Sequence, residues 1–180
     1  NIPHGDIKIR YLDSSLFEGA CQKGKKQGNG SFQYADNSKF KGEFKNNLKH
    51  GKGIYIYSDK SQFEGEYIDD KRNGLGSYQF SDGSYFTGYF QNGFPNGNGI
   101  YLYPDQTRFE GLYMNGLRNE SGSLQYFNGN RFIGRFNTGR VEGKGEYLYQ
   151  DGRKFTGSFK NGIRQGYGVF QYHDQNTYLG

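Results

Sequence analysis

The chain has 180 residues, of which 30 are glycine and 18% are aromatic, and its formal net charge is +5. It lacks an apolar run of about 18 residues, which excludes a membrane-spanning helix, and its single cysteine excludes an internal disulfide and fits a reducing compartment. Leu, Ile and Val are few, so buried surface has to come from phenylalanine and tyrosine. The moderate positive charge favours acidic surfaces as partners.

A Phe-x-Gly motif recurs every 23 residues. Its copies begin at Phe17, Phe40, Phe63, Phe86, Phe109, Phe132 and Phe155. A fixed period of this length is typical of a repeat array. The predicted units are 17–39, 40–62, 63–85, 86–108, 109–131, 132–154 and 155–177. Residues 1–16 match the second half of a partial unit and 178–180 the start of another, so we expect an excerpt of a longer chain.

Each unit predicts two strands when the first phenylalanine is taken as position zero. Positions zero to five alternate aromatic and polar residues, as in Phe86–Phe90. Positions twelve to eighteen form the second strand and carry aromatics at every second residue, as Tyr101 and Tyr103 do in Gly99–Tyr103. Asn92-Gly93 predicts a type I′ turn between them. The predicted fold is all-β: an elongated array of antiparallel β-hairpins forming a continuous twisted meander sheet, which advances about 10 Å per unit. Aromatic rings should lie over the glycines in mid-strand.

The combined pattern resembles the MORN repeat. It runs Phe-x-Gly-x-(Phe/Tyr)-x-x-Gly, then basic-x-x-Gly-x-Gly, then x-Tyr-x-Tyr-x-Asp-Gly, and it covers essentially the whole chain. Two features depart from the family. Position four holds Phe, Tyr or Cys21 where relatives have tryptophan, and the basic-x-His-Gly element persists only as Lys49-His50.

The resemblance implies a non-catalytic scaffold that binds other proteins of a larger assembly. Relatives occur in ciliary radial-spoke heads, protist cytoskeletal rings and membrane junctions. Others lie beside plant phosphatidylinositol-phosphate kinase domains or in front of a lysine methyltransferase domain. We expect a cytoplasmic, cytoskeleton-associated protein of the cilium or axoneme. The alternatives are the regulatory region of such an enzyme or a peripheral membrane tether. Homo-oligomers are compatible with the array.

No motif predicts a catalytic, metal or cofactor site. Gly-x-Gly recurs in almost every unit without a following helix, so it indicates architecture and not a phosphate loop. His4 and His50 share one repeat position before a glycine, as expected of a turn. Glu18 and Glu64 are two units apart, about 20 Å, too far for a catalytic pair. Nucleic acid is not expected, since aromatics that alternate with glycine suit ring-on-backbone packing.

Two surfaces are candidate binding sites. The loop after the first turn of most units carries a basic residue, and these residues are predicted to line up along one edge of the array. The edge could bind acidic proteins or an anionic lipid surface, or its charges could serve only to keep the protein soluble. Its residues are Lys25, Lys26, Lys49, Lys71, Arg72, Arg118, Arg140 and Arg164. On the face opposite the aromatics, aliphatic residues alternate with glutamine and serine from unit to unit. They either form a docking stripe for a partner or pack against the loops of their own units or the curvature of the sheet. They are Ile54, Ile56, Ile100, Leu102 and Leu148.

Overall fold

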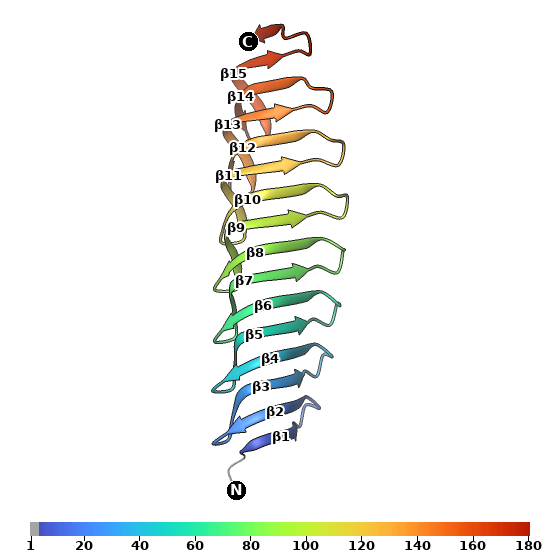
Figure 1. The fold of residues 1–180 in the computed structure, drawn as a ribbon, viewed down its shortest axis with the longest axis vertical. Helices are drawn as coiled ribbons and strands as arrows, with labels where there is room; N and C mark the ends of the chain where they lie inside the picture. The colour runs from blue at the N-terminus through green and yellow to red at the C-terminus, as the bar shows by residue number, and fades with distance from the viewer. Residues whose placement is uncertain (1–3) are drawn as a thin grey trace. The chain divides into compact units, whose positions relative to one another are not determined.

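The computed structural model describes residues 4–180, in which all regular secondary structure is β-strand. The chain divides into two compact units, Asn1–Phe94 (the first unit) and Pro95–Gly180 (the second unit), each of which contains several 23-residue repeats. Within each unit the strands pair in sequence order and antiparallel, which confirms the predicted all-β meander of hairpins (Figure 1). The first three residues of the predicted partial unit 1–16 lie outside the described residues. No helix in 4–180 has the length and apolarity needed to cross a membrane.

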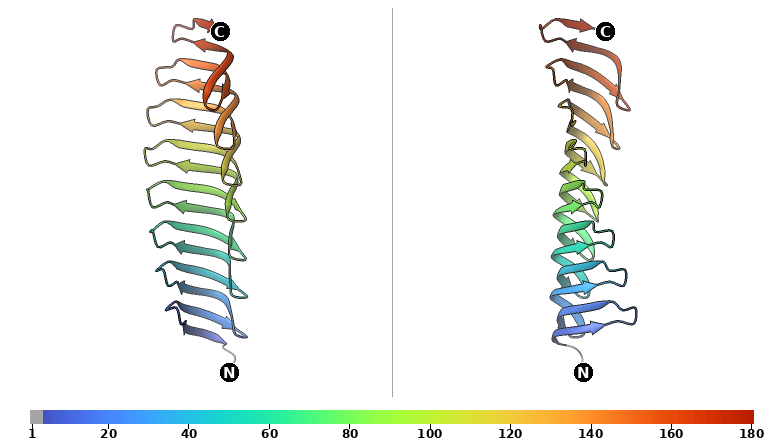
Figure 2. Two further views of the ribbon diagram at one scale, coloured as in Figure 1. Left: turned by 180° about the vertical axis from the view of Figure 1, so that it is seen from behind. Right: turned by 90° about the vertical axis from the view of Figure 1, so that its right-hand side faces the viewer.

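The strands follow the 23-residue period. The first unit contains β1 (Gly5–Arg10), β2 (Leu16–Gln22), β3 (Lys25–Gln33), β4 (Lys39–Lys45), β5 (Leu48–Ile56), β6 (Gln62–Ile68), β7 (Lys71–Gln79) and β8 (Tyr85–Gln91). The strands that follow are β9 (Phe94–Leu102), β10 (Arg108–Met114), β11 (Leu117–Gln125), β12 (Arg131–Asn137), β13 (Arg140–Leu148), β14 (Lys154–Lys160), β15 (Ile163–Gln171) and β16 (Thr177–Leu179). Within each unit, tight turns and longer loops alternate between the two sheet edges (Figure 2).

The tight turns have the predicted backbone. Asn92 and Gly93 both have positive φ, 52° and 94°, as a type I′ turn requires. Asn46 and Asn47 adopt the same conformation, with φ of 51° and 75°. Asparagine tolerates this region because its short polar side chain can bond locally. The hairpin register is therefore set at each tight turn by two residues.

The longer loops are organised by a buried serine that sequence reasoning missed. Ser61 is 3% exposed, and its backbone N–H and its hydroxyl both donate to Asp59 Oδ1, at 2.9 and 2.7 Å. The serine hydroxyl also lies 3.0 Å from the Tyr78 hydroxyl. These hydrogen bonds from Ser61 hold the pKa of the Asp59 carboxyl below its ordinary value. Asp36 and Ser38 repeat the arrangement.

The second strand of each 23-residue repeat starts earlier than predicted. We expected it at positions twelve to eighteen, but β5 runs from Leu48 to Ile56, positions eight to sixteen. The register shifts between Gly42 and Phe44 and then continues to Lys45 opposite Leu48. Gly51 absorbs this bulge at φ +66°, which only glycine adopts at low cost. The segment predicted as a loop is therefore paired strand.

One face of the sheet carries the aromatic core. Phe40 is fully buried, and its ring lies edge-on to Phe44 and to Tyr67, with centroids 5.2 Å apart in both cases. A Cβ added to Gly53 would lie 2.5 Å from Phe40 Cε2 and Cζ, so the ring packs directly on that glycine. The equivalent phenylalanines are at most 9% exposed; they are Phe17, Phe63, Phe86, Phe109, Phe132 and Phe155. The prediction that rings cover mid-strand glycines is confirmed.

Candidate functional site

A row of paired glycines crosses the strands of the first unit. Gly42 of β4 lies opposite Gly53 of β5, and Gly53 lies opposite Gly65 of β6. The row extends to Gly30 on one side and Gly76 on the other. On the aromatic face, phenylalanine rings fill the space that the missing side chains leave. On the opposite face the row is bare backbone between two lines of side chains.

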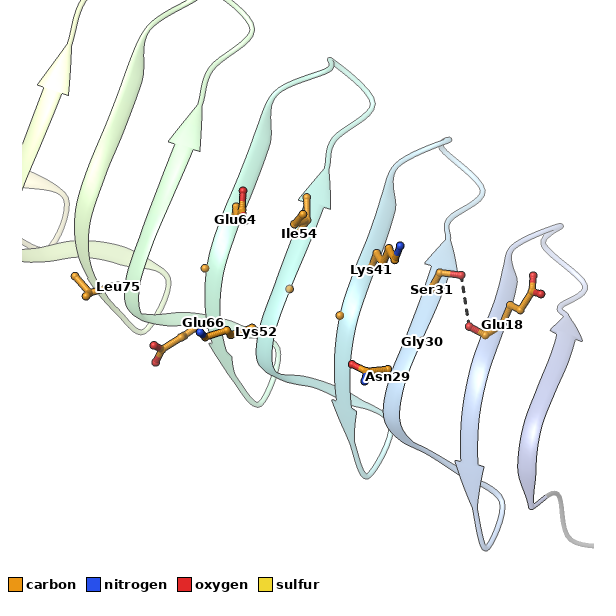
Figure 3. A pocket seen from close by; sticks show the side chains of 13 residues that line it. Glu18, Asn29, Gly30, Ser31, Lys41, Lys52, Ile54, Glu64, Glu66 and Leu75 are labelled. Carbon is orange, nitrogen blue, oxygen red and sulfur yellow. Dashed lines mark hydrogen bonds between the residues drawn. The ribbon is translucent and has the colours of Figure 1, made fainter.

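This bare row is the floor of a groove of about 860 Å³ that runs from β2 to β7. Figure 3 shows its two walls, one on each side of the glycines. The first wall is formed by Glu18, Ser31, Lys41, Ile54 and Glu64. The second wall is formed by Asn29, Lys52, Glu66 and Leu75. The groove runs perpendicular to the strands, so a ligand in it would cross them and would not extend the sheet.

The charges of the first wall differ in how they are satisfied. Glu18 pairs with Lys8, with Oε2 and Nζ 3.4 Å apart. Lys41 and Glu64 have no ion-pair partner within 4.0 Å among the residues that the structure describes. Both side chains are exposed. Each is therefore available to an opposite charge on a ligand.

The second wall carries one cation and one anion, Lys52 and Glu66, which have no ion-pair partner within 4.0 Å among the described residues. Lys52 lies directly opposite Glu66 in the register of β5 and β6. Its backbone N–H donates to Glu43 Oε1 at 3.2 Å. A Cβ on Gly74 would lie 2.4 Å from Glu66 Oε2, so this carboxylate packs on the bulge glycine. Leu75 ends the wall and is 61% exposed, which offers an apolar contact at that end.

The second unit has two smaller grooves over glycines at the same repeat positions. One, of about 390 Å³, lies over Gly157 and Gly168. The other, of about 490 Å³, lies over Gly111, Gly122 and Gly134. Its charged walls are already neutralised within the chain. Arg108 Nη1 lies 2.8 Å from Glu110 Oε2, and Arg135 Nη2 lies 3.1 Å from Glu120 Oε2. The groove of the first unit is thus larger, and fewer of its charged side chains are paired within the chain.

The predicted basic edge is divided between the two faces, which corrects its placement in one loop. Five of its residues lie on the aromatic face with their charges over rings: Lys26, Lys49, Arg72, Arg118 and Arg164. Lys25, Lys71 and Arg140 are exposed one position earlier in their strands, where side chains point to the other face. Binding to an anionic surface stays a prediction.

The ring-bound cations have a defined geometry. Lys26 Nζ lies 4.4 Å from the Phe32 centroid and 5.4 Å from that of Phe17. Lys49 Nζ lies 5.0 Å from the Tyr55 centroid and 3.7 Å from Asp70 Oδ1. Burial lowers the pKa of both lysines from their ordinary value. Such contacts stabilise the aromatic face from its solvent side.

Val141 occupies the repeat position of these cations, so Val141→Arg is expected to stabilise the fold. The equivalent rings are in place: the centroids of Phe132 and Phe159 lie 5.1 Å apart and those of Tyr126 and Tyr147 5.9 Å apart. A guanidinium over them should raise the free energy of unfolding by about 0.5–1 kcal/mol. Urea denaturation followed by circular dichroism measures the change.

The control is Val141→Gln, which adds length without charge and should give less than half of that gain. Equal gains in the two variants would mean that packing of the longer side chain, and not the charge, accounts for the effect.

The predicted docking stripe lies on the face away from the rings. Ile56 and Leu102 are each 41% exposed, and Ile54, Ile100 and Leu148 are half-buried. Only Ile54 of the five lines the groove of the first unit. Its neighbours across the strands are Lys41 and Glu64. A docking role for the whole set stays a prediction.

The other chemistry-bearing residues have structural surroundings. Cys21 is buried at the aromatic position four, opposite Lys26. His50 Nδ1 lies 3.5 Å from Asp69 Oδ1 beside a tight turn. Gly51-x-Gly53 lies within β5. Within residues 4–180, no cluster of His, Cys, Asp and Glu could hold a metal ion.

Comparison with solved structures identifies the same fold. The TCP domain of Drosophila melanogaster SAS-4 (dCPAP), in complex with a proline-rich motif of Ana2 (dSTIL), superposes with a TM-score of 0.55 at 14% identity. The match covers 97% of this chain and 88% of that one. The TCP10 domain of Danio rerio CPAP gives 0.56 at 14% identity, over 98% and 83%. At this identity the likeness is one of fold alone.

Sequence comparison identifies the repeats themselves. No curated protein shows significant similarity to the chain. The MORN repeat, however, matches residues 17–39, 40–62, 63–85, 86–108, 109–131, 132–152 and 155–177. These segments cover most of the 180 residues and share the period of the strands. The chain belongs to the MORN repeat family.

Proposed function

We propose that this chain is a non-catalytic scaffold that binds an extended segment of a partner protein in the groove of its first unit. The groove over Gly30, Gly42, Gly53 and Gly65 carries the proposal. It is long, open and floored by backbone, so it accepts a chain without a deep side-chain pocket. Such a surface contributes to assembly through several weak contacts made at once.

The spacing of the 23-residue repeats matches the pitch of a ligand in the polyproline II conformation. Two strands advance the sheet by about 9.6 Å. A polyproline II helix has three residues per turn and advances about 9.3 Å per turn. A ligand in this conformation therefore presents an equivalent residue to each successive MORN unit. The groove from β2 to β7 spans five strand intervals, or about 24 Å, which is enough for roughly eight such residues.

The comparison supports this class of ligand. The SAS-4 TCP domain, which shares the fold, is seen in complex with a proline-rich motif. A preformed polyproline II ligand also loses little conformational entropy on binding, which suits an open groove. We therefore propose proline-rich segments of other proteins as ligands of this chain.

A neutral peptide tests the proposal. A fluorescein-labelled (Pro-Pro-Gln)4 peptide should bind saturably to the 180-residue chain in a fluorescence anisotropy titration. The exposed Ser31 lines the groove, so Ser31→Trp should block it and abolish binding. The matched control is Gln33→Trp. Gln33 lies two residues after Ser31 on the same strand and face but does not line the groove, so this variant should bind the peptide normally. Equal binding by all three proteins, or by none, would refute the groove as the site.

We further propose that the partner belongs to a cytoplasmic, cytoskeleton-associated assembly, of the ciliary radial-spoke type. The support is the MORN array, because the repeat pattern resembles that of proteins in ciliary radial-spoke heads. The endogenous full-length protein should then cofractionate with isolated axonemes after detergent extraction. Its complete release into the detergent-soluble fraction would contradict this assignment.

A further inference from the structure

We infer that the groove of the first unit selects proline-rich segments that carry one acidic and one basic residue three positions apart. The inference rests on the proposed function and specifies its ligand. Its basis is the pair Lys41 and Glu64, which occupy the same repeat position on β4 and β6 and line the same wall (Figure 3). Ile54 of β5 lies between them, directly opposite each.

These two charges cannot satisfy each other. Two strand intervals separate their backbones by about 9.6 Å, and Ile54 stands between them. Neither has a salt-bridge partner in the part of the chain that the structure describes. Glu18, the third charge of this wall, already pairs with Lys8. Lys41 and Glu64 are thus the charges of the first wall that a ligand meets unpaired.

A polyproline II ligand matches this spacing. Its residues i and i+3 point the same way and lie about 9.3 Å apart. An aspartate can then reach Lys41 while an arginine three residues away reaches Glu64, with proline between them on Ile54. The acidic residue can precede or follow the basic one, because the peptide can lie in the groove in either direction with the same three-residue spacing. When residues i and i+3 face Lys41 and Glu64, two like charges place one of them against a like charge.

The groove over Gly111 and Gly122 in the second unit has charged walls too, but its charges are already paired. There Glu110 is held by Arg108 and Arg135 by Glu120, at 2.8 and 3.1 Å. Ile133 of β12 occupies the repeat position of Lys41 and Glu64 and carries no charge. A charged ligand gains less where the wall charges are already paired, because existing ion pairs would have to be broken.

Four labelled 12-residue peptides test the inference by fluorescence anisotropy. In a common proline background their cores are Asp-Pro-Pro-Arg, Asp-Pro-Pro-Asp, Arg-Pro-Pro-Arg and Asp-Pro-Arg-Pro. The first should bind about fivefold more tightly than each of the others, as expected for two exposed ion pairs. Equal affinities for the four cores would overturn the inference.

Charge reversal in the protein gives the sharper result. Lys41→Glu leaves two acidic positions and should make Arg-Pro-Pro-Arg the preferred peptide, and Glu64→Lys should make it Asp-Pro-Pro-Asp. The matched control is Lys39→Glu, which changes net charge equally on an exposed position of the same strand, outside the groove. It should leave the preference for Asp-Pro-Pro-Arg intact. The same switch in Lys39→Glu would reduce the effect to net charge and overturn the inference.

The outcomes separate this inference from the proposed function. If the neutral (Pro-Pro-Gln)4 peptide binds and Ser31→Trp abolishes that binding, but the charged cores are not distinguished, only the charge selection is wrong. If no proline-rich peptide binds, both are wrong. Self-association of the chain that Ser31→Trp abolishes would assign the groove to a second copy and would also overturn the inference.

Discussion

Replacing Phe63 by alanine is expected to lower the free energy of unfolding by about 3–5 kcal/mol, the usual cost of deleting a buried phenyl ring. Phe63 is fully buried and lies edge-on to Tyr67 and Phe90, with centroids 5.4 and 5.0 Å apart. Its ring also covers Gly65 and Gly76, whose side chains are absent. Neighbouring strands therefore cannot fill the cavity. Urea denaturation followed by circular dichroism measures the loss.

The control for Phe63→Ala is Tyr89→Ala. Tyr89 belongs to the same unit but is 52% exposed on the opposite face, where it pairs with Leu75 across the strands. It should cost about 1 kcal/mol or less, within the range of a cross-strand pair. Similar losses at the two positions would mean that stability is not concentrated in the layer of buried rings.

Gly42→Ala is expected to destabilise the chain by about 3 kcal/mol, the upper end of the range for overpacking. The added Cβ would lie 2.5 Å from Gly53 Cα and 2.6 Å from the Lys52 carbonyl oxygen. Both are backbone atoms of the paired strand, so no side-chain rotation relieves the clash. It would also lie 2.8 Å from Phe40 Cζ, on the ring that covers this glycine. Thermal unfolding and urea denaturation should both report the loss.

A glycine in another role provides the control for Gly42→Ala. Gly93 has φ +94° in a tight turn, with nothing within 4 Å of an added Cβ. Asn47 holds the same turn position at φ 75°, so Gly93→Asn should change stability by about 0.5 kcal/mol or less. A larger loss for Gly93→Asn than for Gly42→Ala would mean that turn conformation, and not the close approach of strands, limits stability.

Much of the fold could be predicted because each unit repeats the same short-range pattern. Even spacing of Phe40 and Phe44 places both rings on one face, and Asn-Gly dipeptides predict the tight turns. The start of β5 was predicted wrongly at position twelve. A bulge at Gly51 keeps the preceding residues paired, and a glycine in the sequence does not distinguish a bulge from a loop.

The candidate site was harder to predict than the fold. The glycines at positions two and thirteen of each repeat were interpreted as space for rings, which accounts for the aromatic face. On the opposite face, the predicted docking stripe named one residue that lines the groove, Ile54. The basic residues were grouped by their nearness in sequence, but Lys25 and Lys26 are adjacent and therefore point to opposite faces of β3.

The sequence by itself determined the period, the strand content and the face that each aromatic residue occupies. These follow from alternation within single hairpins, which is a local property of the chain. Only the tertiary structure decided that Gly42 meets Gly53 and Gly53 meets Gly65 in one row, and that Lys41 and Glu64 stand unpaired along it. The physical reason is register: pairing between strands brings together residues from successive units, and bulges shift that pairing by amounts that alternation along one strand does not specify.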